Sequence, residues 1–167
     1  QRLVDEFKEI LTIRYGTMVF HSPSQGLCGQ VHVLLPDKSI TLHYGPYLSR
    51  MMDRIGMDDV PPALSPDVEG LFSPSTDPTP LSPSAAAEFR TVNGELIHVL
   101  PLRHDAKKVI SFLLTKGKSP DNSDYLKQLH LLRYLKGTLT LGPTFSADPA
   151  DYPNGVELHS ACDSAHN

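Results

Sequence analysis

The apolar residues at the start of the chain recur with the spacing of a helix. Between residues 2 and 15, Leu3, Phe7, Ile10 and Leu11 fall on one face, as a period of 3.6 residues requires. Asp5 lies in the first turn, where the helix dipole favours a negative charge. The pattern predicts an amphipathic helix from Arg2 to Tyr15.

The next stretch changes to the period of a β-strand. A short strand is predicted over residues 17–20, followed by a polar loop over 21–26. Residues 30–44 alternate apolar and polar positions on both sides of a turn at Pro36-Asp37-Lys38, which is typical of a β-hairpin. Residues 46–55 return to helical spacing, and Gly56 ends that helix.

Residues 60–87 differ from both flanks in composition. They are rich in Pro, Ser and Thr, with repeated Ser-Pro and Thr-Pro steps and few large apolar side chains. A proline biases the residue before it away from the helix, and so few apolar groups do not offset the entropy of ordering. We therefore expect a disordered linker. The alternative is that this Pro-rich stretch docks to a partner protein.

Two further elements are predicted between residues 88 and 117. Residues 91–102 are apolar and β-branched around Asn93-Gly94 and fit either a helix or an extended segment, of which we favour the helix. Asp105 is expected to cap a second helix, whose stripe is Ala106, Val109, Ile110 and Leu113. Gly117 ends it, and residues 118–122 turn the chain into an antiparallel neighbour.

That neighbour is the clearest helix of the sequence. Capping oxygens are available at residues 122–124, and an apolar stripe is formed by Leu126, Leu129, Leu132 and Leu135. Gly137 is expected to end the helix in the left-handed conformation. Alternation from Leu139 through Leu141 to Phe145 then predicts a strand.

Charge is distributed unevenly along the 167 residues. The net charge is −4, yet residues 86–141 carry nine basic and five acidic side chains. Such a block suits phosphate contact, although charged helix faces are more often simply solvated. The candidates for this basic block are Lys107, Lys108, Lys116, Lys118, Lys127, Arg133 and Lys136.

Several function classes lack a sequence signal. No window of the sequence is long and apolar enough for a membrane span, and we expect an intracellular protein with reduced cysteines. No glycine-rich phosphate loop occurs, so a small-molecule ligand is not expected. The eight histidines are dispersed along the chain. Asp, His and Ser residues occur together at 159–164, but we expect no catalytic relay there, because neighbours on a strand alternate faces.

The string Leu132-Arg-Tyr-Leu-Lys-Gly-Thr138 resembles the LRYLKGT signature of copia-type LTR retrotransposon Pol polyproteins. Residues 47–57, Tyr-Leu-Ser-Arg-Met-Met-Asp-Arg-Ile-Gly-Met, are similar to the thumb helix of the family's reverse transcriptase. Leu27-Cys28-Gly29 lies where the family's primer-grip hairpin would fall. An ordinary strand with a bulge is the alternative interpretation of Cys28 and Gly29.

The last residues are similar to the first strand of the family's RNase H. Asp163 aligns with the first catalytic carboxylate and would be a Mg²⁺ ligand only in a complete site. The alternative interpretation is that Asp163 is a residue of the turn at the end of a strand. Such a site gathers several carboxylates around two divalent ions. The paired aspartates of the polymerase are absent, so we expect the chain to be inactive alone, with Mg²⁺ implied for the parent enzyme only.

Together these observations predict an α+β chain in four parts. Residues 1–59 would hold the palm end, the hairpin and the thumb helix, 60–87 the linker, 88–141 a helical connection, and 142–167 the truncated start of an RNase H-like fold. The resemblance implies a Pol fragment, in a cytoplasmic or nuclear retroelement particle, that helps to hold an RNA/DNA template–primer duplex. Leu27, Cys28, Gly29, Lys107, Lys108, Arg133 and Lys136 are the predicted contacts. The alternative is a decayed or host-adopted remnant that acts as a small protein-interaction module.

Overall fold

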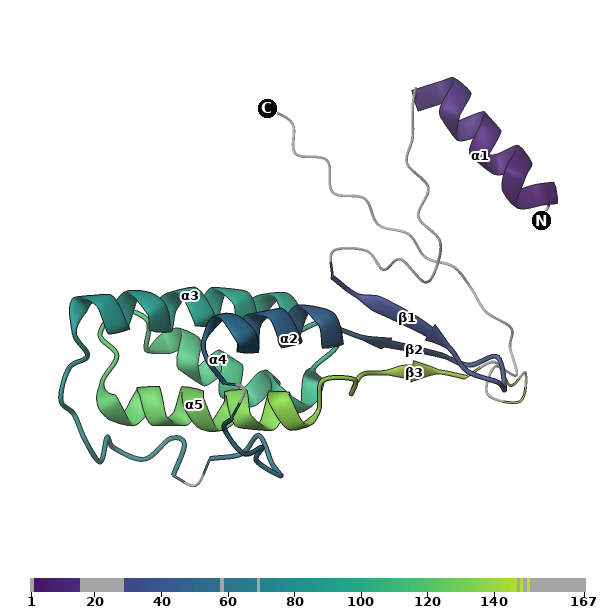
Figure 1. Cartoon of the computed structure of the whole chain (residues 1–167). Coiled ribbons are helices and arrows are strands. Elements are labelled where there is room, and N and C mark those ends of the chain that lie inside the picture. Colours follow the sequence, from purple (N-terminus) through teal and green to yellow (C-terminus); the bar gives the residue numbers. More distant parts are fainter. Residues whose placement is uncertain are drawn as a thin grey trace.

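Helices and one small antiparallel sheet make this an α+β protein, as the sequence predicts (Figure 1). A computed structural model describes residues 2–15, 29–57, 59–68, 70–146, 148 and 150. The elements in chain order are α1 (Arg2–Tyr15), β1 (Val31–Leu34), β2 (Ile40–His43), α2 (Gly45–Arg54), α3 (Pro83–Val99), the 3₁₀ turn η2 (His104–Ala106), α4 (Lys107–Thr115), α5 (Asn122–Gly137) and β3 (Thr144–Phe145).

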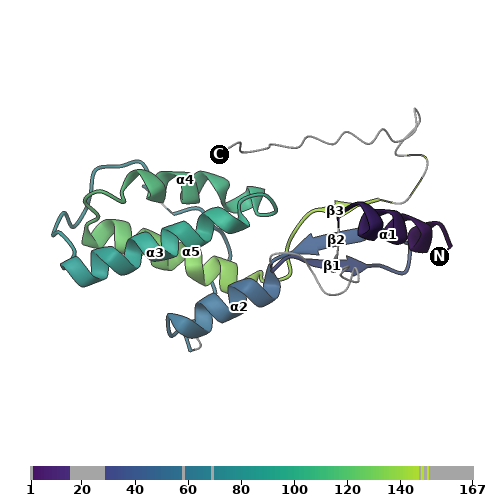
Figure 2. The ribbon, with the colours of Figure 1, turned by 90° about the horizontal axis from the view of Figure 1, so that it is seen from above.

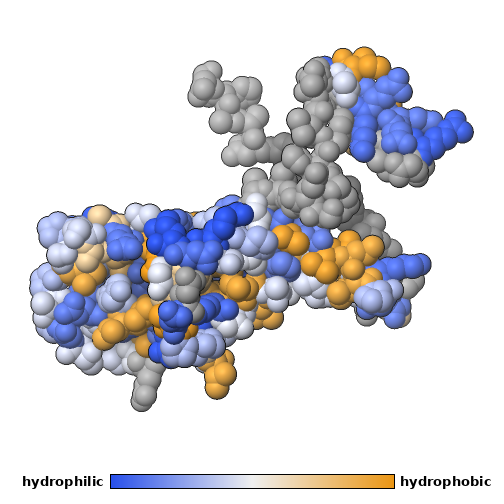
Figure 3. Space-filling view, in the orientation of Figure 1, coloured by the Kyte–Doolittle hydropathy of each residue, from blue (hydrophilic) through white to orange (hydrophobic). Residues whose placement is uncertain are grey.

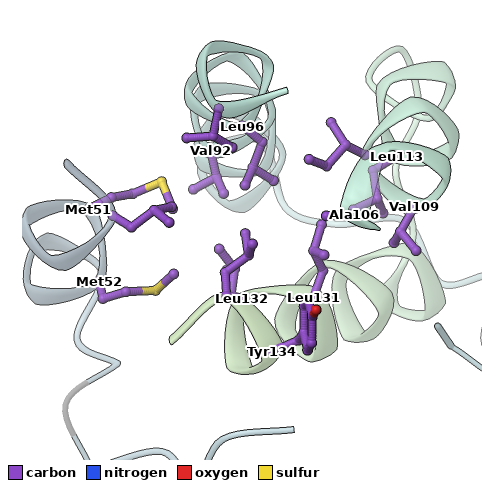
Figure 4. Close-up of a cluster of buried hydrophobic side chains, with 14 of the residues drawn as sticks. Met51, Met52, Val92, Leu96, Ala106, Val109, Leu113, Leu131, Leu132 and Tyr134 are labelled. Atoms are coloured by element: carbon purple, nitrogen blue, oxygen red, sulfur yellow. The ribbon is translucent and has the colours of Figure 1, made fainter. Parts of the chain in front are cut away.

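Helices α2, α3, α4 and α5 share one apolar core. Figure 4 shows side chains from all four helices directed toward one another: Met51 and Met52, Val92 and Leu96, Val109 and Leu113, and Leu131 and Leu132. Each fully buried aliphatic side chain stabilises the fold by roughly 1.5–3 kcal/mol. The core therefore unites α2 with helices that the sequence assigned to a separate segment.

A buried amide pair fixes how three of these helices meet. The Gln128 side chain on α5 donates to the Phe89 carbonyl at 3.0 Å and to Asn93 Oδ1 at 2.8 Å. Asn93 in turn donates to the Leu113 carbonyl of α4 at 3.1 Å. A buried amide without a partner costs about 1–3 kcal/mol, so this set of bonds favours one register of α3, α4 and α5.

The predicted hairpin is confirmed. β1 and β2 pair antiparallel with Leu34 opposite Ile40, and Lys38 in the turn has a φ of 69°. The Asp37 carboxylate accepts a hydrogen bond from the Ser39 amide at 2.9 Å, which closes the turn. β2 then runs directly into α2, and the sheet extends away from the helices (Figures 1 and 2).

The strand predicted after α5 is much shorter than expected. Only Thr144–Phe145 forms a hydrogen-bonded strand, while residues 138–143 form turns and irregular backbone. β3 pairs with β2, so that the sheet order is β1-β2-β3 and Phe145 lies opposite Ile40. Thr144–Phe145 therefore adds a third strand to the hairpin, and the residues predicted as the first RNase H strand lie outside the described residues.

The chain between α2 and α3 differs from the disordered linker that composition predicts. Leu71 is buried, and Val60, Ala63, Val68 and Leu81 pack against the core. These scattered apolar residues are too few to form a core alone, but α4 and α5 offer them a surface that already exists. Because the sequence gives no sign of this surface, composition underestimates the packing.

Helix α3 begins well before the predicted stretch. Ser82 is its N-cap, accepting from the Ala85 amide at 3.3 Å, and Pro83 occupies the first turn. Proline is favoured at this position because the first-turn amides have no partner within the helix. The last part of the predicted linker, 83–87, is therefore helical.

Helix α5 is the predicted one, with a different cap. Asp121 is the N-cap and forms a capping box with Asp124, whose amide donates to Asp121 Oδ1 at 2.8 Å. Leu132 and Leu135 are buried, but Leu126 is 59% exposed. The predicted stripe is therefore displaced around the helix, toward Leu131 and Tyr134.

Gly137 ends α5 for a reason other than the predicted left-handed conformation. That prediction is wrong, because positive φ among the described residues occurs only at Gly29, Lys38, Gly56 and Gly70. A Cβ on Gly137 would lie 2.8 Å from Pro62 Cβ. Glycine is required here by the close approach of the chain between α2 and α3.

Asp105 is not the predicted helix cap. The carboxylate instead forms a two-point ion pair with Arg103, with Nε–Oδ1 at 3.1 Å and Nη2–Oδ2 at 2.8 Å. Arg103 is fully buried and also donates to the carbonyl and hydroxyl oxygens of Thr138. Tyr134 donates to Asp105 Oδ2 at 2.8 Å. Asp105 therefore anchors the end of α5 rather than the start of α4.

The first helix has the predicted bounds, Arg2–Tyr15. Its apolar residues Phe7, Ile10 and Ile13 are exposed by 59–78%. Figure 3 also shows apolar atoms gathered over the sheet, where Leu34 and Phe145 are more than half exposed. The strand predicted at 17–20 and the loop at 21–26 lie outside the described residues.

Candidate nucleic-acid interface

The predicted primer-grip segment is described only at Gly29. Leu27 and Cys28 lie outside the described residues. Gly29 has a φ of +81°, and a Cβ added there would lie 3.3 Å from Tyr47 Cβ on α2. Side chains rarely adopt this φ, so the glycine allows the chain to enter β1 close to α2.

Lys107 and Lys108 lie exposed at the start of α4, as a phosphate contact requires. The Lys107 side chain has no hydrogen bond or ion pair with the described part of the chain. Lys108 Nζ lies 3.8 Å from Asp67 Oδ1 and 5.5 Å from the Phe72 ring centroid. Both partners of the Lys108–Asp67 pair are more than half exposed, so the pair is weak and the ammonium stays accessible.

Arg133 and Lys136 have another role. Arg133 Nε donates to the Pro61 carbonyl at 2.8 Å, and Lys136 Nζ donates to the carbonyls of Met57 and Val60 at 2.7 and 3.0 Å. These bonds hold the chain after α2 against α5. The structure therefore places the two predicted contacts between segments of the protein.

Two of the three remaining lysines of the basic block lie over one aromatic ring. The ammonium groups of Lys116 and Lys127 each lie 5.0 Å from the Phe112 ring centroid. Lys116 Nζ also lies 4.0 Å from Asp124 Oδ1. Burial raises the pKa of Asp124, and the nearby Asp121 carboxylate adds to this, while the Asp121 hydrogen bond and the two lysines oppose it. Only Lys118 among these three is exposed.

The predicted catalytic chemistry falls outside the described part of the chain. Asp163, the residue aligned with the first RNase H carboxylate, is not among the described residues. Within residues 2–15, 29–57, 59–68 and 70–146, no three His, Cys, Asp or Glu side chains converge as a metal site requires. The group of carboxylates implied for Mg²⁺ is therefore not found among the described residues.

A cavity lies between α5 and the chain that crosses it, and the sequence does not predict it. Its volume is about 480 Å³. The α5 side contributes Ser123, Leu126, Lys127, Leu129, His130 and Arg133, and the crossing chain contributes Val68, Gly70, Ser73, Pro74 and Thr76. Lys127, His130 and Arg133 recur every three positions along α5, and this spacing can be seen in the sequence. The opposite wall comes from residues that the sequence predicted to be disordered, so the cavity itself could not be predicted.

Within the described residues, no helix is long and apolar enough to cross a membrane. Comparison with known proteins gave no further guide: no family model matches the sequence, no curated protein is similar to it, and no solved structure matches the fold.

Proposed function

We propose that this chain is a segment of a copia-type Pol polyprotein that holds a template–primer duplex by contacts to the phosphate backbone. The observation that carries the proposal is the accessible pair Lys107 and Lys108 at one end of α4. The resemblance to the family also supports the proposal, through the LRYLKGT string and the order of hairpin, thumb-like helix and helical connection.

The proposed contact surface is smaller than the one predicted from the sequence. Arg133 and Lys136 donate to backbone carbonyls of residues 57–61 and are removed from the proposed surface. Lys107 and Lys108 remain, with Lys118 beyond the other end of α4. Few phosphate contacts imply weak, sequence-independent binding that salt abolishes.

The test compares two variants with the same change of charge. Fluorescence anisotropy with an RNA/DNA duplex over a salt series should give a shallower salt dependence for Lys107→Gln/Lys108→Gln. The log–log slope should decrease by about 0.9 for each phosphate that the variant no longer neutralises. Arg133→Gln/Lys136→Gln should keep the wild-type slope and lower the melting temperature. Equal slopes in both variants and the wild type would refute the proposal.

A second candidate is a host-adopted remnant that acts as a protein-interaction module. The exposed apolar side chains of α1 and of the sheet favour it, since apolar patches on a surface mark interaction sites. The DNA on either side separates the two candidates. A continuous frame with the polymerase aspartates upstream and the rest of RNase H downstream favours Pol, whereas independent start and stop codons favour the module.

A further inference from the structure

The end of the Pro-rich segment, residues 77–81, pairs with residues 120–123 at the start of α5. Pro80 and Asp121 form an isolated antiparallel bridge. Three backbone amides donate to carbonyls beside this bridge: Leu81 to Pro120 at 3.1 Å, Asn122 to Thr79 at 3.0 Å, and Ser123 to Asp77 at 3.3 Å. The pairing is only a few residues long, so a change of charge at one of its side chains can act on all of it.

The Asp77 side chain connects the two paired stretches. One carboxylate oxygen accepts from the Thr79 amide at 3.1 Å, and the other accepts from the Asn122 side-chain amide at 3.0 Å. Hydrogen bonds from Thr79 and Asn122 hold the pKa of Asp77 below its usual value, so the carboxylate is ionised at neutral pH. Asp121 and Asp124 add two more carboxylates, in the capping box of α5. A further negative charge beside Asp77 would therefore oppose the pairing.

Thr79 is the position at which such a charge can be added. It is exposed and precedes Pro80, and a Ser or Thr followed by Pro is the pattern that proline-directed protein kinases modify. These kinases bind their substrate as an extended chain, and a proline favours extended backbone in the residue before it. The other Ser-Pro pairs among the described residues contain a bend or cap a helix: Ser65-Pro66, Ser73-Pro74, Ser82-Pro83 and Ser119-Pro120. Only Thr79-Pro80 already lies in a straight paired stretch.

We propose that Thr79 is a phosphorylation site for a proline-directed kinase, and that its modification separates residues 77–81 from the start of α5. The Thr79 hydroxyl oxygen bonds to the γ-phosphorus of a nucleoside triphosphate, the bond from that phosphorus to the bridging oxygen breaks, and the nucleoside diphosphate leaves. The hydroxyl proton passes to the kinase. The phosphate brings a charge of about −1.5 to −2 beside the Asp77 carboxylate, and their repulsion disrupts the bonds of Asp77 to Thr79 and Asn122. Neither Lys107 nor Lys108 takes part in these bonds, so the site goes beyond the proposed duplex contacts.

The experiment treats the full chain with Mg-ATP and a purified proline-directed kinase, and mass spectrometry locates the phosphate. Thr79 should be modified, and Thr79→Ala should lose that phosphate. Brief digestion of the folded protein with proteinase K should then cut residues 75–82 about tenfold faster in the phosphorylated chain than in the unmodified one. Cleavage measures the pairing because proteolysis follows the population of the locally open form.

Two glutamate variants test whether the position of the charge matters. Thr79→Glu supplies part of the phosphate charge and should speed cleavage of residues 75–82 about threefold. Ser73→Glu is the matched control, since Ser73 is exposed in the same segment and is not among the hydrogen-bond partners of Asp77 or Asp121. It should be cut like the wild type. In an Asp77→Asn background Thr79→Glu should have a smaller effect, because the charge that it repels is gone.

Four results would overturn the proposal: no phosphate on Thr79, cleavage that is unchanged or slower after phosphorylation, equal effects of Thr79→Glu and Ser73→Glu, or an undiminished effect of Thr79→Glu in the Asp77→Asn background. None of these measurements uses nucleic acid, so their failure is distinct from failure of the duplex test.

Discussion

At the scale of single residues, Arg103 decides how the end of α5 is held. It is fully buried, and Asp105, Thr138 and Tyr134 surround its guanidinium group. A buried ion pair adds little net stability, but removal of one partner leaves an uncompensated charge. The stability of the bundle should therefore depend strongly on Asp105.

Replacement of Asp105 by alanine should lower the free energy of unfolding by about 3 kcal/mol, because Arg103 stays buried without its counter-charge. Urea denaturation measures the change. Asp53→Ala on the exposed face of α2 is the control, with an expected effect below about 0.5 kcal/mol. A similar small effect at Asp105 would show that water reaches Arg103.

The Asp105 carboxylate should also make the free energy of unfolding depend on pH. Burial alone would raise the pKa of Asp105, but hydrogen bonds from Arg103 and Tyr134, with the charge of Arg103, outweigh it and hold the pKa below its usual value. A lowered pKa stabilises the fold above the unfolded-state value of about 3.9, and this contribution disappears as the pH falls through the lower folded value.

Urea midpoints measured from about pH 6 down to about pH 3 should therefore fall less steeply in Asp105→Asn than in the wild type, from a lower starting value. Parallel curves would mean that Asp105 has the same pKa in the folded and unfolded states.

At the scale of elements, α5 serves two neighbours at once. One side packs against α3 and α4, and Arg133, Lys136 and His130 hold the chain between α2 and α3 on another side. Gly137 lets that chain approach the helix end. Two glycines in helices should consequently respond in opposite ways to alanine.

Gly137→Ala gains about 1 kcal/mol of helix propensity, but its Cβ would lie 2.8 Å from Pro62 Cβ, an atom of a rigid ring. We expect the clash to prevail, with a net loss of about 1–2 kcal/mol and faster proteolysis within 60–82. Gly94→Ala in α3 meets no atom within 4 Å and should gain about 0.5–1 kcal/mol. Thermal melts compare the two variants, and stabilisation by both would mean that the crossing chain moves freely.

At the scale of the whole molecule, the proposed role is to hold a duplex, and catalysis by the chain alone is not expected. Polymerase and nuclease chemistry both need carboxylates that converge on two divalent ions. The sequence offers Asp163 alone for such a role, outside the described residues.

Purified protein with Mg²⁺ or Mn²⁺ should therefore neither extend a primer nor degrade the RNA strand of a hybrid, as measured on labelled substrates. Asp163→Asn is the control, with no change expected. Activity that persists through repurification and disappears in Asp163→Asn would contradict the fragment hypothesis.

Local patterns in the sequence determined the hairpin and most of the helices, but not the start of α3. The bounds of α1, the turn at residues 36–38 and the course of α5 follow from periodicity and turn chemistry, which act between near neighbours. The 3.6-residue spacing did not predict which face of α5 is buried, because other helices cover α5 on several sides.

Tertiary structure alone decided the partners of residues far apart in the chain. It paired β3 with β2, placed Asp105 on Arg103 and Tyr134, and gave the Pro-rich segment a surface to pack on. It also separated Lys107, which is free to meet a ligand, from Arg133 and Lys136, which bind backbone carbonyls. Charge is visible in a sequence, but whether a cation faces water or a carbonyl depends on a segment dozens of residues away.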